Sequence, residues 1–465
     1  MTLPHDWPHF DALALGALID EGRLDPVSLT EAAIERISRF DPHGRIFWHG
    51  SEERALTEAI AAHDRAKKGL RRSPLDGVPV AWKDNIEAVG APTTNGSRLL
   101  RHHIAKRDAV VLERGVRAGL ITLGKTALVE FAFSGLGINP TMGSPDNPYD
   151  NNTPRAPGGS SCGSAVAVAR GLAPIAVGTD TAGSVRIPAA WNGLVGLKTT
   201  AGSIPLDGIH PLSPTLDTVG PLARSIADAA ALWVILARRP ALDFAGVDLA
   251  RLHFAVPNSA EIETHPDVWA AFAIAIEQLR SAGARIEAAT LGVIDRTHET
   301  MDTKGTPVAA EGWAIWGELI ESDPEKVYAG VRMRMKKGAD AYSGTALMEI
   351  EGIFKDLRQA YARETAPYDA VIMPTAAEPP PPISDLDTPE GYTAANLGAL
   401  RFTRLANMLG LAALTLPCGL TAPAKGHPPL PVGLMLMGPA GSEAKLLRLG
   451  AAIEELLPKT ALPIS

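Results

Sequence analysis

Apolar residues recur along the chain in two different periods, which predict helices and strands in alternation. Apolar residues spaced three or four positions apart, as on the buried face of a helix, mark the segments 11–21, 28–39, 51–68, 109–119, 225–237, 266–282 and 442–457. Short continuous apolar runs, which are typical of buried strands, mark 120–123, 172–177, 252–257, 285–289, 411–417 and 431–437. This alternation predicts an α/β fold.

Three of these segments carry further local signals. Residues 28–31, Ser-Leu-Thr-Glu, match a capping box and predict the start of the second helix. Gly69 is the residue type expected directly after the third helix. Between 74 and 85 a turn leads into a short apolar strand that ends at Lys83. A lysine there either pairs with an acid or takes part in chemistry, and the strand alone does not decide between these interpretations.

The segment 291–400 has a less regular pattern. It mixes tryptophan, methionine and a pair of lysines with the proline run 379–382. Two interpretations remain open, a cap over a pocket and a region packed on the body of the fold. We find no internal repeat and no flexible linker, although 465 residues would by length suggest two or three domains or one unusually large sheet.

Composition narrows the classes of protein that fit. Hydrophobic residues make up 46% and charged residues 21% of the chain, as in an ordinary globular protein. The net charge is −8 and no long basic run occurs, so nucleic acid is not expected as a direct partner. Two cysteines, Cys162 and Cys418, exclude a disulfide framework and a multi-cysteine metal site, and they fit a reducing, cytoplasmic location.

Two segments bear on whether the protein is secreted or crosses a membrane. The first ten residues lack the basic start and apolar centre of a signal peptide. The longest uncharged apolar tract, 408–424, contains Pro417 and Gly419 and is punctuated like a strand and a loop. We therefore expect a cytoplasmic protein without a membrane partner.

The candidate chemistry concentrates in the stretch 156–200. There, three clusters of glycine and serine surround two apolar segments. Small residues let backbone N–H groups approach a ligand, and the hydroxyls of Ser160, Ser161, Ser164 and Ser184 offer nucleophiles or relays. The alternative is a flexible linker, for which the apolar segments are too hydrophobic. The stretch is therefore typical of a catalytic loop system.

Two short motifs admit other interpretations. Residues 119–126 match the phosphate-binding pattern G-x-x-x-x-G-K-[ST], but the four variable residues belong to a predicted strand instead of a loop, so we reject it. Residues 159–163 match the nucleophile elbow G-x-S-x-G, with Ser161 as nucleophile, but a proline-broken loop precedes them where the elbow requires a strand. Cys162 favours packing, since a histidine partner would have to come from a distant part of the chain.

The cluster 178–184, Gly-Thr-Asp-Thr-Ala-Gly-Ser, has a better context for acyl transfer. It follows a predicted strand, and its small residues can bend the chain so that several N–H groups face one developing anion. Ser184 would then stand beside its own oxyanion hole. Its hydroxyl needs a base, and the local candidates are lysines whose pKa burial lowers.

The run GGSSCGSAVAVARGLAPIAVGTDTAGSVRIPAAWNGLVGLK resembles the signature of the amidase signature family, whose enzymes use a serine, a second serine in a cis peptide and a lysine. Other segments agree with it. PLDGVPVAWKDN resembles the family's lysine segment, LGKTALVEFAF its next strand and loop, and LTLPCG with PLPVGLMLMGP its C-terminal strands. The resemblance spans about residues 13–457.

The resemblance implies a role for particular residues. Ser184 matches the acylated nucleophile, Ser160 the cis serine, and Lys83 the base. Backbone N–H groups of the oxyanion hole would come from Thr181, Ala182, Gly183 and Ser184. Supporting residues would be Ser161, Asp180 and Arg186, and the substrate pocket would include Phe131, Ala132, Phe133, Gly158 and Gly159. For Lys125 and Lys198 we favour a structural role.

The chain departs from the family pattern in three places. Ala182 and Cys162 stand where glycine is common, and Trp191 with Asn192 replaces a common Phe-Cys pair. None of these changes removes a catalytic group. Ala182 does require that the backbone of the oxyanion hole accept a Cβ atom at this position.

The resemblance also implies the fold, one large α/β/α domain over 1–465 with a mixed, twisted sheet covered by helices. Its parts would be N-terminal helices at 1–70, a catalytic core at 71–235, a variable pocket or cap segment at 291–400, and C-terminal strands and a helix at 401–465. The implied reaction is hydrolysis of a small-molecule amide to an acid and an amine or ammonia, without metal or organic cofactor. Aryl amides, esters and carbamates remain candidate substrates, which makes the protein a urethanase candidate too.

Two alternatives come from other functional classes. One is the glutaminase (A) subunit of a tRNA-dependent amidotransferase, which acts within a complex. The other is a non-enzymatic binding or scaffold protein, against which the presence of Lys83, Ser160 and Ser184 argues. The sequence gives neither the physiological substrate nor the oligomeric state, for which a homodimer is one alternative.

Overall fold

An 11-stranded mixed sheet runs through the centre of the computed structural model, which describes residues 4, 6–423 and 428–464. Its strands are β1 (Phe47–Gly50), β2 (Pro79–Lys83), β3 (Ile121–Thr126), β4 (Ile175–Asp180), β5 (Val195–Lys198), β6 (Thr218–Ala223), β7 (His253–Pro257), β8 (Arg285–Ala289), β9 (Ala370–Pro374), β10 (Ala412–Leu420) and β11 (Pro431–Gly438). In space they follow the order β1-β3-β2-β4-β6-β5-β10-β11-β9-β7-β8. β2 is parallel to β3 and β4, and β7 is parallel to β8 and β9, whereas the other neighbours are antiparallel.

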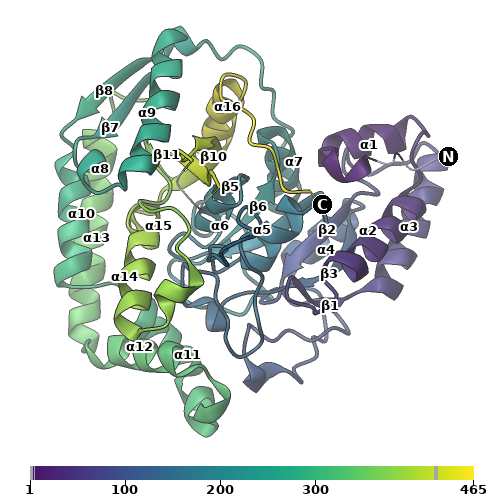
Figure 1. Cartoon of the computed structure of the whole chain (residues 1–465), viewed down its shortest axis with the longest axis horizontal. Helices are drawn as coiled ribbons and strands as arrows, with labels where there is room; N and C mark the ends of the chain where they lie inside the picture. The colour runs from purple at the N-terminus through teal and green to yellow at the C-terminus, as the bar shows by residue number, and fades with distance from the viewer. Residues whose placement is uncertain (1–3, 5, 424–427, 465) are drawn as a thin grey trace.

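Helices cover both faces of this sheet, which confirms the predicted single α/β domain (Figure 1). They are α1 (Ala12–Asp20), α2 (Pro26–Phe40), α3 (Glu52–Lys67), α4 (Val110–Arg117), α5 (Cys162–Ala169), α6 (Arg186–Trp191), α7 (Ile226–Ala237), α8 (Ser259–Ile262), α9 (Pro266–Ser281), α10 (Gly292–Thr303), α11 (Val308–Ser322), α12 (Ala329–Asp340), α13 (Gly344–Glu364), α14 (Pro389–Leu400), α15 (Thr403–Met408) and α16 (Glu443–Glu454). The helices α1–α3 lie at one end of the molecule and α10, α12 and α13 at the other (Figure 1). Within the described ranges, no helix has both the length and the apolarity that crossing a membrane requires.

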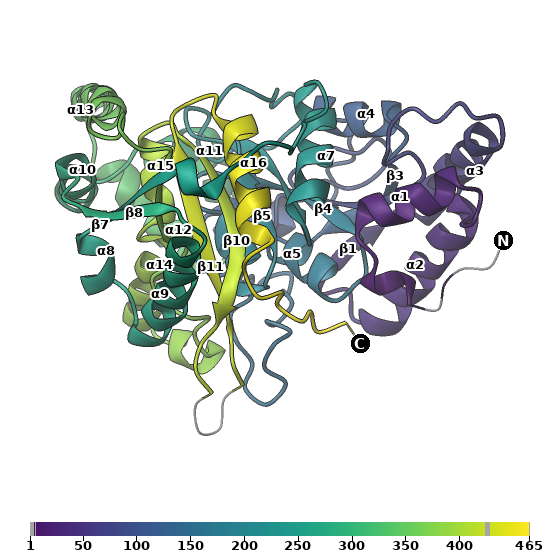
Figure 2. The same cartoon turned by 90° about the horizontal axis from the view of Figure 1, so that it is seen from above.

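Alternating side chains of the central strands divide the core into two layers. Leu434 and Leu436 of β11 pack in the same cluster as Leu447 of α16, on one face of the sheet. Met435 and Met437 of the same strand pack in a second cluster with residues of α10, α13 and α15. Because successive strand residues point to opposite faces, this pattern buries both faces of the sheet. Figure 2 shows β10 and β11 running through the middle of the molecule between these helices.

Most of the predicted elements are found within a few residues of their expected ends, and one start signal was wrong. α2 begins at Pro26, because the side chain of Asp25 accepts the N–H of Val27 and caps the helix there. The capping box predicted at Ser28 therefore lies inside the helix. β3 continues through Thr126, and Gly119, which follows α4, has a φ of 94°. Residues 119–126 are therefore a helix end and a strand, which agrees with the sequence analysis and not with a phosphate-binding loop.

The segment 291–400 is more regular than its sequence pattern suggests. It folds into α10 to α14 with β9 between α13 and α14. Met333 of α12 is 57% exposed and Met348 of α13 is 78% exposed, so apolar residues on the outer faces of these helices obscure the helical period. The expectation of an irregular segment was therefore wrong for most of its length.

Candidate active site

Two parallel strands bring the first site residues together. β2 and β4 are neighbours, with Trp82 opposite Val177, so their carboxyl ends lie at the same edge of the sheet. Lys83 ends β2, while Thr179 and Asp180 end β4. In α/β sheets ligands bind in crevices outside the carboxyl ends of the strands. The sheet topology thus brings Lys83 to the glycine- and serine-rich stretch, although 96 residues separate it from Thr179.

The amino group of Lys83 is fully buried among hydroxyl and carbonyl oxygens. Lys83 Nζ lies 2.7 Å from Ser160 Oγ, 2.7 Å from Thr179 Oγ1 and 3.3 Å from the carbonyl oxygen of Thr179. Burial lowers the pKa of Lys83 to about 7, although the nearby Cys162 and Asp180 act in the opposite direction. A lysine with this pKa is partly neutral near pH 7 and can accept a proton from the hydroxyl it contacts.

Ser160 and Ser161 lie in the loop before α5. The peptide bond between Gly159 and Ser160 is cis. Ser161 Oγ donates to the carbonyl of Thr179 at 3.3 Å, and the N–H of Ser161 donates to the carbonyl of Ser184 at 3.2 Å. Ser161 therefore ties this loop to β4 and to the turn that carries Ser184. Its hydroxyl is buried and engaged, and a loop precedes it, which argues against the nucleophile-elbow interpretation.

Ser184 lies in the turn between β4 and α6, and the carboxylate of Asp180 holds this turn in place. Asp180 accepts the N–H groups of Gly183 at 2.8 Å and Val185 at 3.1 Å, and it forms an ion pair with Arg186 at 3.0 Å. Burial alone would raise the pKa of Asp180, but the charge and hydrogen bonds of Arg186 outweigh it and keep that pKa well below its usual range. Asp180 and Arg186, two of the three expected supporting residues, thus contact the turn that carries Ser184.

The same hydrogen bonds narrow the expected set of oxyanion-hole groups. The N–H of Gly183 already donates to the carboxylate of Asp180, which distinguishes it from the other three expected groups. The N–H groups of Thr181, Ala182 and Ser184 donate to no other group among the residues described. The left-handed conformation falls on Gly183, with a φ of 137°, and not on Ala182. An alanine is therefore accepted at 182 without backbone strain.

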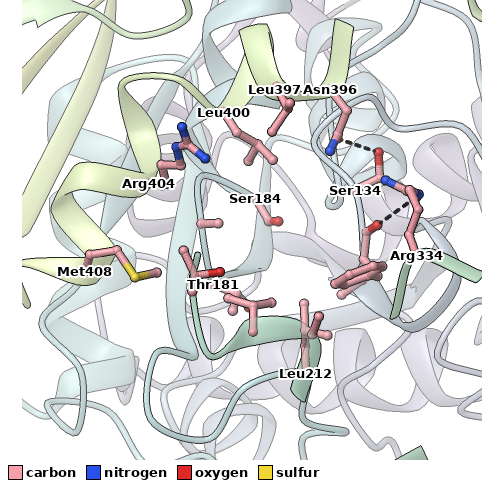
Figure 3. Close-up of a pocket in the computed structure, with 16 residues that line it drawn as sticks. Ser134, Thr181, Ser184, Leu212, Arg334, Asn396, Leu397, Leu400, Arg404 and Met408 are labelled. Carbon is pink, nitrogen blue, oxygen red and sulfur yellow. Dashed lines mark hydrogen bonds between the residues drawn. The ribbon is translucent and has the colours of Figure 1, made fainter. Parts of the chain in front are cut away.

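A cavity of about 200 Å³ opens in front of Ser184 (Figure 3). Thr181 and Ala182 line it beside Ser184. Its other walls come from distant parts of the chain, namely Ala132, Phe133, Ser134, Leu212, Thr306, Val308, Ala309, Arg334, Asn396, Leu397, Leu400, Arg404 and Met408. The only charged residues in this lining are Arg334 and Arg404. The cavity is thus mostly apolar, and its charge is positive.

Only part of the predicted pocket lines this cavity. Ala132 and Phe133 do, whereas Phe131 is buried against Trp316, with ring centroids 5.4 Å apart. Gly158 and Gly159 are also not part of the lining. A Cβ atom on Gly158 would meet the backbone of Pro188, and one on Gly159 would meet the backbone of Gly137, so both glycines serve close packing behind the site. The place of these three residues in the substrate pocket stays a prediction.

Sequence reasoning missed four residues that take part in the site. Thr179 contacts Lys83, and Asn85 Nδ2 donates to Thr179 Oγ1 at 3.1 Å. Asp217 accepts a hydrogen bond of 2.5 Å from the hydroxyl of Thr181, and burial raises the pKa of Asp217 to about 6. Arg334 enters the cavity from α12. Thr179 lies within the cluster 178–184 and Asn85 is the last residue of the segment PLDGVPVAWKDN, which was a usable signal. Asp217 and Arg334 lie in none of the predicted motifs.

The other candidate nucleophile and bases have structural surroundings. Lys125 forms a buried ion pair with Asp84 at 2.8 Å. Lys198 donates to the carbonyl of Leu411 at 2.7 Å, and burial lowers its pKa to about 7. Cys162 is buried, and burial raises the pKa of its thiol to about 12, so it is not a thiolate at neutral pH. The structural interpretation of both lysines and of Cys162 agrees with these contacts.

Comparisons with known proteins show the family to which the chain belongs. The family model described as Amidase matches residues 28–447. The 2-amino-5-chloromuconic acid deaminase of Comamonas testosteroni is 34% identical over 97% of this chain and 96% of its own length. The A subunit of the glutamyl-tRNA(Gln) amidotransferase of Chloroflexus aggregans is 33% identical over 94% of each chain. A crystal structure of an amidase, 30% identical, covers 97% of this chain and all of its own with a TM-score of 0.85. The chain therefore belongs to the amidase signature family and is a hydrolase of that family.

Proposed function

We propose that the protein hydrolyses carboxylic amides through an acyl-enzyme on Ser184, with Ser160 as proton relay and Lys83 as base. The observation that carries this proposal is the 2.7 Å contact between the buried Lys83 Nζ and Ser160 Oγ, next to a cavity that Ser184 lines. A hydroxyl in an apolar cavity becomes a nucleophile when a neighbouring base removes its proton. The lowered pKa of Lys83 supports that role.

The proposed reaction has two halves. Ser184 Oγ attacks the amide carbonyl while its proton passes to Ser160, whose own proton passes to Lys83. The C–N bond then breaks, and the proton returns to the leaving amine or ammonia. Water attacks the ester on Ser184 through the same relay and releases the acid. The N–H groups of Thr181, Ala182 and Ser184, which have no other acceptor among the described residues, would stabilise the oxyanion.

Arg334 supports an acidic substrate. Its guanidinium carbon lies 5.4 Å from the ring centroid of Phe133 and 4.7 Å from that of Tyr392. Its Nε and Nη2 donate to the carbonyls of Gly330 and Phe133, and it forms no ion pair with a described carboxylate. Arg404, the other charged residue of the cavity, is already paired with Asp302 at 2.9 Å. A carboxylate on the substrate would supply the anionic partner that Arg334 lacks among the described residues. We therefore propose an amide that carries a carboxylate as the preferred substrate, in a cytoplasmic protein.

A second candidate function is the glutaminase step of an amidotransferase. Arg334 favours it, because glutamine is a carboxylate-bearing amide and this arginine forms no ion pair among the described residues. The A subunit of the Chloroflexus aggregans amidotransferase is 33% identical over 94% of this chain. The two functions differ in their need for partners. Ammonia release by the isolated chain supports the independent amidase, whereas release from glutamine only in a complex with other proteins supports the amidotransferase role.

The decisive experiment is an assay of the purified chain on matched amides, anilides, carbamates and esters, with and without a carboxylate. The Ser184→Ala variant should lose activity by about 10⁴- to 10⁶-fold. A serine-reactive sulfonyl fluoride should label Ser184 in the parent enzyme and nothing in that variant. Labelling of Ser161 instead would overturn the assignment of the nucleophile, and preference for carbamates would make the protein a urethanase.

A further inference from the structure

Three side chains with metal-binding atoms meet on two loops outside the cavity. Glu87 and His103 lie in the chain between β2 and α4, and His210 lies between β5 and β6. Main-chain hydrogen bonds fasten the two loops together: Ile86 forms an antiparallel bridge with Ile209, the N–H of Glu87 donates to Gly208, and the N–H of His210 donates to Asn85. The relative position of the loops is therefore fixed by backbone, independently of the three side chains.

The donor atoms of this cluster have the spacing of a metal site. Glu87 Oε1 lies 3.3 Å from His103 Nε2 and 3.7 Å from His210 Nε2, and all three atoms lie within 4.8 Å of one another. Zinc ligands at about 2.0–2.2 Å in a tetrahedron stand roughly 3.3–3.6 Å apart. Two of the three separations between donor atoms are thus already close to those between the ligands of a bound zinc ion. The third separation joins His103 to His210, and the side chain of His103 is 41% exposed, which leaves it room to rotate.

We propose that Glu87, His103 and His210 bind one divalent transition-metal ion of the Zn²⁺ type, with water as the fourth ligand. Two imidazoles and one carboxylate suit zinc and its neighbours, whereas calcium and magnesium prefer sites made of oxygen ligands alone. The partly exposed His103 gives an ion access from solvent. The nearby charges of Lys125 and Asp84 form an ion pair of their own at 2.8 Å and so leave the carboxylate of Glu87 to the ion.

The position of this site gives the ion a structural effect on the catalytic region. Asn85, two residues before Glu87, donates to the Thr179 hydroxyl that contacts Lys83. Two residues after His210, Leu212 lines the cavity. The three ligands themselves do not line the cavity, so the ion would hold two loops beside the site without taking part in the reaction. A bound ion that is absent from the unfolded chain raises the stability of the folded one.

The test uses tag-free, chelator-treated full-length protein. Zn²⁺ is titrated calorimetrically, and Co²⁺ is added in parallel because its visible absorption reports a tetrahedral site. We expect one ion per chain and a higher melting temperature with Zn²⁺. His103→Ala should weaken Zn²⁺ binding by at least about tenfold and remove the shift in melting temperature. The matched control is His102→Ala. This variant removes the neighbouring histidine, whose ring accepts a hydrogen bond from Arg101 outside the cluster. It should leave the Zn²⁺ affinity and the shift in melting temperature unchanged.

Glu87→Gln gives a second, nearly isosteric probe in case His103→Ala fails to fold, which circular dichroism would reveal. It should also weaken Zn²⁺ binding by at least about tenfold. The proposal is overturned if the parent protein binds no stoichiometric Zn²⁺ at micromolar concentration. It is equally overturned if His103→Ala or Glu87→Gln binds Zn²⁺ as tightly as His102→Ala. Neither outcome depends on hydrolytic activity, so the result is separate from the test of the proposed function.

Discussion

The amino group of Lys83 determines the pH range in which the proposed reaction proceeds. Burial among Ser160 and Thr179 lowers the pKa of Lys83 to about 7. Only the neutral amine accepts a proton, so the active fraction increases as pH rises through this pKa and is lost as pH falls below it. A lysine that remained charged at pH 7 would be unable to act as the base.

We expect kcat/KM to rise about tenfold per pH unit below pH 7 and to level off above it, measured at constant ionic strength with a neutral amide. Lys83→Ala should lower kcat by several orders of magnitude and abolish this dependence in the residual activity. Asp217, whose pKa burial raises to about 6, titrates nearby, so Asp217→Asn serves as the control. Because the charge of Asp217 raises the pKa of Lys83, Asp217→Asn should move the midpoint to lower pH and keep it. A midpoint that survives in Lys83→Ala would contradict the assignment.

Arg334 determines which substrates the site prefers, if the cavity binds a carboxylate. A hydrogen-bonded charge contributes about 1.5–3 kcal/mol, which corresponds to roughly 10- to 100-fold in kcat/KM. Arg334→Met should therefore lower kcat/KM by that factor for carboxylate-bearing amides and leave matched neutral amides nearly unchanged. Arg332→Met, on the same helix but outside the lining, is the control. An equal loss for both substrate classes would mean that Arg334 acts only through packing.

The turn between β4 and α6 depends on one buried ion pair. Arg186 and Asp180 are both fully buried, and Arg186 also donates to the side chain of Asn407. Removing one partner of a buried pair leaves the other charge uncompensated and costs about 3–5 kcal/mol. Arg186→Met should lower the free energy of unfolding by that amount, measured by denaturant titration. Arg296→Met removes an ion pair with Glu364 at a half-exposed surface and should cost less than about 1 kcal/mol.

The order of helices and strands was more predictable from the sequence than their exact ends and packing partners. Strands such as β10 and β11 are continuous apolar runs because both faces are buried, and such runs are visible in sequence. The start of α2 was misjudged because Asp25 competes with Ser28 as a cap, and the choice depends on local geometry. The helical period of 291–400 was obscured by exposed apolar residues such as Met348. Propensity and pattern describe a segment and not what packs against it.

Two C-terminal strands join the two parts of the sheet. β10 pairs with β5, β11 pairs with β9, and the two pair with each other. A chain that ends at residue 410 would leave β5 and β9 as unpaired edges, which promote aggregation. We expect it to be insoluble or to elute as an aggregate in size-exclusion chromatography. A chain that ends at residue 457 keeps every described helix and strand and should remain monodisperse; a folded, soluble 1–410 chain would contradict the expectation.

The site residues also divide into those that local sequence predicts and those that only tertiary packing brings to the site. Lys83, Ser160 and Ser184 come from motifs whose spacing is dictated by backbone turns, so their resemblance to a family was informative. Arg334 comes from a helix that only tertiary packing brings to the cavity. The displacement of Phe131 from the cavity likewise depends on its packing against Trp316, which no local pattern encodes. Contacts between distant segments are what a single sequence does not contain.

The helix α15 has a consequence for how such an enzyme acquires new substrates. Thr403 donates to the carbonyl of Ala182 at 2.7 Å and accepts from Arg186, while Arg404 and Met408 of the same helix line the cavity. A mutation that reshapes this wall will also disturb the catalytic turn. α11 and α12 line the cavity without a hydrogen bond to residues 180–186 among the residues described. Divergence in substrate range, in nature or in directed evolution, should therefore accumulate in α11 and α12 before it reaches α15.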